Sequence, residues 1–308
     1  MQNFAVVSAQ LPSCAPFSVR SCYVSGVMKR SISTHVFLHQ RLHAGLLDAM
    51  VAAGAESIEL FAARHHFDYA DRSEVKELAK WFRSNNCRAT MHQPIFDGRG
   101  SGSNWSKHVP PTINLIDVEK SRRIDAMDEV KRALEAAEQI DIDSMVLHLG
   151  TRDDTWSERT LDLSMTAVEH VKAFAHPLGV KTLIETLPND VTSPEHLMEM
   201  LRIAHLDTVG VCLDVGHMNL HDMPGIAESF RLLGDRIKQL HLHDNDGEHD
   251  EHCWPGEGKV DWAAVRAGLA GLKQPPVGTL EIRYDPETTT KAMSEKAARA
   301  FTMLEQTA

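Results

Sequence analysis

Imidazole and carboxylate side chains recur along this chain at the points where short apolar runs end. Such runs include MVLHLG at 145–150, VCLDVGH at 211–217 and QLHLHD at 239–244. The candidate ligands in these and similar runs and the loops after them are His92, His148, Glu185, Asp214, His217, His243, Asp250, His252 and Glu281. Imidazoles and carboxylates suit zinc, manganese and related divalent ions. The pattern therefore predicts a metal-dependent enzyme.

The elements that would position these residues are short strands alternating with longer amphipathic segments, which is typical of βαβ units around a parallel sheet. Eight strands are predicted, at about 31–37, 56–61, 87–92, 144–149, 180–185, 209–214, 237–243 and 278–283. Eight alternations without a Gly-rich phosphate loop after the first strand favour an α/β fold of one (β/α)₈ barrel over a doubly wound sheet. Because the carboxyl ends of all barrel strands meet on one face, the candidate ligands would converge there.

Two helices have clear sequence signatures. Apolar residues recur at three- and four-residue steps over 118–140, which predicts an amphipathic helix. The segment 193–204 opens with Ser193 as an expected N-cap and Pro194 at the first helical position.

Two connections, at 93–117 and 244–260, are longer than a minimal turn between a strand and a helix. Long loops in a compact fold usually cover a site or bind a ligand. Both follow strands that end in candidate ligands, so we expect them to lie over the same face.

Composition narrows the class of protein. The hydrophobic fraction of 43% and charged fraction of 24% are ordinary for a globular protein. No apolar run approaches the roughly 18 residues of a membrane span, and the net charge of −11 disfavours non-specific binding to nucleic acid. The five scattered cysteines indicate reduced thiols and a cytoplasmic location. Residues 1–27 are interpreted as an extension, with Met28 the better initiator and 28–308 the barrel.

The choice between neighbouring candidate ligands rests on local geometry. Asp214 and His217 are three residues apart, and Gly216 between them lets the backbone turn so that both side chains can face the mouth. His241 and His243 alternate along one strand and point to the same side. His243 lies nearer the mouth and is predicted as the ligand, whereas His241 is interpreted as a core residue or a support for other ligands.

The chain resembles the xylose isomerase-like (β/α)₈ superfamily, which contains sugar isomerases and epimerases as well as endonuclease IV-type repair enzymes. The resemblance covers roughly residues 30–305. Its most specific blocks are LIET at 183–186, GVCLDVGH at 210–217, HLHDNDG at 241–247, DEHCWPGEGKVDW at 250–262 and TLEIRYD at 279–285.

The epimerase branch implies one ion and a proton shuttle. By resemblance, the ion would be held by Glu185, Asp214, His243 and Glu281. Glu185 and Glu281 would act as acid and base on a carbon beside a carbonyl, through an enediolate. Further expected substrate contacts are His92, His148, His217 and Arg283.

The endonuclease IV branch implies three zinc ions and a phosphodiesterase acting on abasic DNA. By resemblance, His92 and His148 would join Glu185 at one ion, Asp214, His243 and Glu281 would join it at a second, and His217, Asp250 and His252 would hold a third. The segment QPIFDG after His92, the LDVGH motif and the scarcity of Arg and Lys in the long loops depart from that branch.

The leading prediction is a metal-dependent isomerase or epimerase of a small carbohydrate, with Mn²⁺, Zn²⁺, Mg²⁺ or Co²⁺ as the cofactor and one to three ions bound. The abasic-DNA phosphodiesterase is the alternative, and a lyase or a binding protein on the same fold also stays open. Barrels of this type often pair through helical faces, so a homo-oligomer is an open expectation.

Overall fold

The computed structural model describes residues 28–96 and 111–306. Within them, parallel strands close into a barrel in chain order, with β1 paired to β8. The strands are β1 (Lys29–Ser33), β2 (Ser57–Phe61), β3 (Arg88–His92), β4 (Ile142–Leu147), β5 (Lys181–Glu185), β6 (Gly210–Asp214), β7 (Ile237–Leu242) and β8 (Val277–Leu280). The predicted (β/α)₈ barrel is confirmed. The expected extension at 1–27 and residues 97–110 of the first long connection lie outside the described residues.

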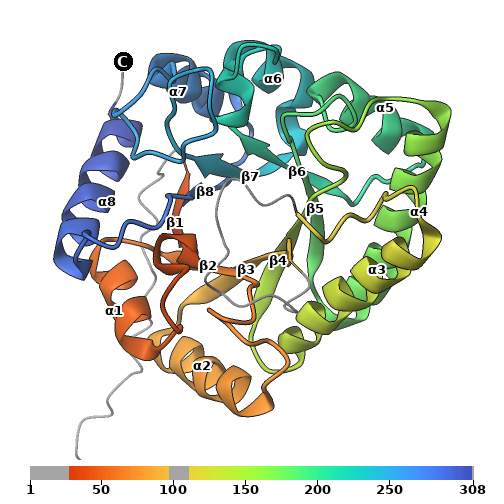
Figure 1. The fold of residues 1–308 in the computed structure, drawn as a ribbon. Coiled ribbons are helices and arrows are strands. Elements are labelled where there is room, and N and C mark those ends of the chain that lie inside the picture. Colours follow the sequence, from red (N-terminus) through yellow and green to blue (C-terminus); the bar gives the residue numbers. More distant parts are fainter. Residues whose placement is uncertain (1–27, 97–110, 307–308) are drawn as a thin grey trace, which may run out of the picture.

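A ring of helices surrounds the strands (Figure 1). The α-helices are α1 (Ala44–Ala52), α2 (Arg72–Asn85), α3 (Lys120–Leu134), α4 (Glu158–Ala175), α5 (Pro194–Ile203), α6 (Ile226–Leu233), α7 (Trp262–Gly271) and α8 (Thr290–Glu305). None of those described is long and apolar enough to cross a membrane.

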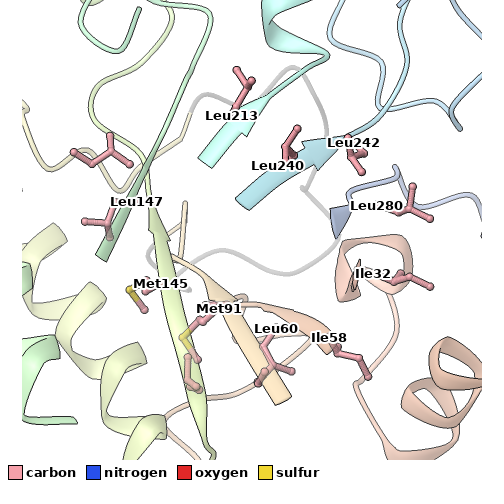
Figure 2. Packing of buried hydrophobic residues seen from close by; sticks show 14 of the residues in the cluster. Ile32, Ile58, Leu60, Met91, Met145, Leu147, Leu213, Leu240, Leu242 and Leu280 are labelled. Atoms are coloured by element: carbon pink, nitrogen blue, oxygen red, sulfur yellow. The ribbon is translucent and has the colours of Figure 1, made fainter. Parts of the chain in front are cut away.

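Successive side chains along each strand point alternately toward the helices and toward the barrel interior, and both faces are buried. Apolar residues such as Ile58, Leu60 and Leu240 are fully buried and belong to the main core cluster. Figure 2 shows this set distributed around the barrel between strands and helices. The residues between them in sequence, such as Glu59 and His241, are also fully buried but point to the interior of the barrel. The barrel therefore has an apolar outer layer and a partly polar interior.

Most element boundaries agree with the sequence prediction within two residues. At α5, Ser193 is the N-cap, its Oγ accepts from the backbone N–H of His196, and Pro194 is the first helical residue. The main difference is at β1, which ends at Ser33, because residues 34–37 form a 3₁₀ helix capped by the Ser33 hydroxyl. The predicted helix at 118–140 is α3 followed by a 3₁₀ turn at 135–138.

Candidate metal centre

The structure brings all nine predicted candidate ligands, and one further histidine, to the carboxyl-terminal mouth of the barrel. They form three adjacent groups, in each of which one ligand atom per residue lies within 4.8 Å of the others. The groups are His92, His148 and Glu185 (group 1); Glu185, Asp214, His241 and Glu281 (group 2); and His217, His243, Asp250 and His252 (group 3).

Group 1 joins the ends of β3, β4 and β5. His92 Nε2 lies 2.9 Å from His148 Nε2 and 3.5 Å from Glu185 Oε2, and His148 Nε2 lies 3.0 Å from the same oxygen. His92 Nδ1 lies 2.8 Å from the carbonyl of Gln93, so it is the protonated nitrogen and Nε2 has the lone pair. Two imidazole nitrogens at 2.9 Å need a proton or a cation between them.

Group 2 is built around His241 on β7. Its Nδ1 lies 3.3 Å from Glu185 Oε1, 3.1 Å from Glu281 Oε2 and 3.8 Å from Asp214 Oδ2. All four side chains are at most 4% exposed. Because Glu185 Oε2 faces group 1 while Oε1 faces His241, this one carboxylate links the two groups.

The sequence prediction placed His243 in one site with Glu185, Asp214 and Glu281, and the structure differs from that prediction. His241, which was interpreted as core or support, is the histidine that faces both glutamates. The reason is register, since His241 pairs with Asp214 across β6 and β7 and so lies at the level of the other strand ends. His243 lies beyond the end of β7, with Nε2 3.0 Å from Asp214 Oδ1, and belongs to group 3.

Group 3 combines strand ends with the connection that follows β7. Asp250 Oδ2 lies 3.3 Å from both His217 Nε2 and His252 Nε2, and Asp250 Oδ1 lies 3.8 Å from His243 Nε2. His217 Nδ1 is 2.9 Å from the Thr186 carbonyl, and His252 Nδ1 is 2.8 Å from that of Glu281. These contacts keep a proton on Nδ1 of both rings, so Nε2 is the nitrogen that would bind a cation.

The segment 244–260 is held over the mouth by one buried carboxylate. Asp244 Oδ1 accepts from the backbone N–H groups of Asn245 and Val260, at 3.0 and 2.9 Å. Asp244 Oδ2 accepts from the N–H of Gly256 at 2.8 Å and from Trp262 Nε1 at 2.9 Å. The backbone of Asp244 also forms an antiparallel bridge with Cys253. This anchoring fixes the position of Asp250 and His252.

Opposite charges at the centre shift the pKa values of its members. Burial alone would raise the pKa of Glu185 and of Glu281, but the neighbouring histidines, His241 foremost, outweigh it and both pKa values fall well below the ordinary value. Burial opposes protonation of His252, yet Asp250 raises its pKa to about 10. Protons on the imidazoles thus balance the carboxylates when no cation is bound.

The donor sets fit divalent cations. With bonds of 2.0–2.1 Å, two ligand atoms of a tetrahedral zinc site lie about 3.3 Å apart. The contacts of 2.9, 3.0 and 3.5 Å in group 1, and of 3.3, 3.3 and 3.8 Å in group 3, scatter around this value. In His92, His217 and His252 the other ring nitrogen is already hydrogen-bonded to a backbone carbonyl, which orients these imidazoles as metal ligands.

Besides His241, two residues near the centre were missed from sequence, Glu59 and His35. Glu59 lies inside the barrel, with Oε2 3.2 Å from His241 Nε2. His35 is in the 3₁₀ helix after β1, its Nδ1 is 3.1 Å from the Ile282 carbonyl, and burial lowers its pKa to about 3. A glutamate inside the apolar run SIELF was the available signal for Glu59.

Arg283, an expected substrate contact, is exposed, and its backbone N–H donates to the His252 carbonyl at 2.9 Å. Its role stays a prediction. Beside the mouth, loops after β4 to β7 line a cavity of about 440 Å³. Its charged lining consists of four carboxylates, Asp153, Asp190, Asp222 and Glu248, with Arg152 and His221.

Comparisons with known proteins identify the family of this barrel. A family profile described as xylose isomerase-like TIM barrel matches residues 47–304. The chain is 30% identical to a probable endonuclease 4 of Natronomonas pharaonis over 180 residues, which are 53% of this chain and 64% of that protein.

Two solved structures share the fold. The crystal structure of D-psicose 3-epimerase in the presence of D-fructose matches with a TM-score of 0.70 and 17% identity, over 91% of this chain and all of that one. The crystal structure of IOLI protein with a binding zinc atom matches with a TM-score of 0.72 and 19% identity, over 90% of this chain and 98% of that one.

Proposed function

Because this chain belongs to the xylose isomerase-like TIM barrel family, we propose that it is a metal-dependent isomerase or epimerase of a small sugar or sugar phosphate. The observation that carries the proposal is the convergence of two buried glutamates, from the ends of β5 and β8, on one histidine nitrogen at 3.3 and 3.1 Å. These strands lie on different parts of the barrel ring (Figure 1), so the carboxylates approach the centre from different directions. An acid and a base on two sides of one carbon can invert its configuration.

The chemistry assigned to the glutamates is a proton transfer. One carboxylate removes the proton from the carbon beside a carbonyl, and the electron pair moves onto the carbonyl oxygen to give an enediolate. The other glutamic acid returns a proton to the opposite face in an epimerase, or to the neighbouring carbon in an isomerase. A bound divalent cation supplies Lewis-acid polarisation of the substrate oxygens and stabilises the developing negative charge.

The surroundings of the glutamates support this assignment. Glu185 is 1% exposed and Glu281 is 3% exposed, so bulk water has little access to either carboxylate. The low pKa of each keeps the glutamate that acts as the base ionised at neutral pH. The D-psicose 3-epimerase of similar fold also supports a ketose as the substrate class.

A zinc phosphodiesterase acting on abasic DNA is the second candidate. The observation that favours it is the presence of groups 1 and 3 beside group 2, which provides donor sets for three ions, together with the similarity to a probable endonuclease 4. The carboxylates that line the cavity beside the mouth would repel a phosphate backbone. The sugar isomerase or epimerase is therefore preferred.

Solvent deuterium incorporation tests the leading proposal. The protein loaded with Mn²⁺, Co²⁺ or Zn²⁺ is incubated in D₂O with ketopentoses, ketohexoses and their phosphates, and exchange at the carbons beside the carbonyl is followed by NMR. We expect exchange with at least one substrate pair, reduced roughly 10²–10⁴-fold in Glu185→Gln and in Glu281→Gln. Glu257→Gln is the matched control, because this exposed glutamate pairs with Lys296 on the surface.

Absence of exchange with every pair would overturn the sugar proposal. Cleavage of a duplex containing an abasic site, abolished by a chelator and by His92→Ala, would establish the second candidate instead.

A further inference from the structure

A buried carboxylate lies behind group 2, on the far side of His241 from the two glutamates. Glu59 is on β2 and His241 is on β7, and in the barrel ring β1 and β8 lie between these strands. The contact of 3.2 Å between Glu59 Oε2 and His241 Nε2 therefore crosses the barrel interior. Both residues are fully buried.

The imidazole of His241 thus has two different neighbours. Nδ1 faces Glu185 and Glu281, whereas Nε2 faces Glu59. A neutral imidazole has one protonated nitrogen and one lone pair. A carboxylate can only accept, so the contact with Glu59 favours the tautomer with the proton on Nε2 and the lone pair on Nδ1.

The position of Glu59 is itself fixed. Gln239, two residues before His241 on β7 and also fully buried, donates from Nε2 to the same Oε2 of Glu59. The Gln239 nitrogen lies 3.5 Å from His241 Nε2, farther than the carboxylate oxygen does. Glu59 is therefore the nearer partner of His241 Nε2.

We propose that Glu59 is a positioning residue that holds His241 in the Nε2–H tautomer, so that Nδ1 is presented as a cation ligand in group 2. A carboxylate behind a ligating imidazole fixes the ring orientation and increases the basicity of the ligating nitrogen. The inference rests on cation binding by group 2, which is part of the proposed function, and is independent of which sugar is the substrate.

Zn²⁺ affinity, measured by competition with a chromophoric chelator, tests this role. The binding class that disappears in His241→Ala identifies the ion of group 2. In Glu59→Met, which removes the acceptor, we expect the affinity of that class to fall roughly 10–100-fold. In Glu59→Gln, whose amide oxygen can still accept from both Nε2 atoms, we expect a smaller loss, so the conservative variant rescues binding in part.

Glu129→Gln is the matched control. Glu129 is also a buried glutamate, but it lies on α3 and pairs with Arg64, Tyr69 and Arg132. This variant should lose stability without a change in Zn²⁺ affinity. Equal affinity in the wild type and in folded Glu59→Met would overturn the role of Glu59 alone, while a wild type that binds no Zn²⁺ would overturn the metal site as well.

A second measurement does not depend on the variants folding. In the Zn²⁺-loaded wild type, long-range ¹H–¹⁵N correlation of the histidine rings should show a protonated Nε2 and a metal-bound Nδ1 for His241. A protonated Nδ1, or a metal-bound Nε2, would overturn the proposal.

Discussion

Replacing Asp244 by Asn should detach the 244–260 segment from the barrel. Each carboxylate oxygen of Asp244 accepts two hydrogen bonds, Oδ1 from Asn245 and Val260 and Oδ2 from Gly256 and Trp262. An amide keeps only one acceptor oxygen, so in either orientation two buried donors face an NH₂ group. At about 1–3 kcal/mol for each unsatisfied buried donor, the expected loss is about 2–6 kcal/mol. At about 2–4 °C per kcal/mol, a central loss of about 4 kcal/mol corresponds to a Tm lower by roughly 12 °C.

Two measurements distinguish global from local loss. Thermal unfolding reports the whole barrel, and amide hydrogen exchange reports opening of 244–260. Asp261→Asn is the control, because Asp261 caps α7 through a single oxygen that accepts from Ala263 and Ala264, which Asn can also supply. If Asp244→Asn changed Tm by less than about 2 °C and left exchange in the segment unaltered, the anchoring role would be refuted.

Three further outcomes are expected. In Gly216→Ala, the new Cβ would lie 2.0 Å from His243 Cε1, while the backbone at φ −70° would accept alanine without strain. Urea unfolding should therefore show a loss of about 1–3 kcal/mol in the free energy of unfolding. Gly271→Ala is the control and should show no loss, because no described atom lies within 4 Å of its new Cβ. Burial lowers the pKa of His66 to about 4, so protonation of this ring opposes folding. The free energy of unfolding should therefore fall by about 3 kcal/mol as pH drops from 6.5 to 4. If His66→Gln showed the same dependence of unfolding free energy on pH as the wild type, this reasoning would be contradicted. Chelation should lower the free energy of unfolding by about 2.7 kcal/mol if the free ion had been at a hundredfold excess over Kd, and should lower Tm with it. An equal Tm with and without chelator would contradict ion binding.

The fold and the location of the centre were predictable because the relevant signals are local. Strands that end in His or Glu after an apolar run were identified one by one, and a closed barrel requires their carboxyl ends to share a mouth. Glu185 and Glu281 could be recognised from their local sequence, without knowledge of the residues that they contact. The structure confirms the barrel and places both side chains beside His241.

The sequence prediction assigned His243 to the group in which the structure has His241, and the physical cause of this difference cannot be read from sequence alone. Both side chains point inward, so alternation cannot separate them, and the level of each in the barrel depends on the register between β6 and β7. Glu59 was missed for a similar reason, since its partner lies 182 residues away across the barrel interior. Contacts across the interior depend on closure of the ring and leave no periodic signal.

The two halves of the barrel contribute unequally to the centre, and this has a consequence for assembly. Among the described ligands, the ends of β3 and β4 provide only His92 and His148. The ends of β5 to β8, together with the segment that follows β7, provide the rest. Group 1 is the one that joins both halves, through Glu185. A cation bound in group 1 would link the two halves of the barrel. If the two halves are expressed as separate fragments, we therefore expect them to associate more strongly when zinc is supplied.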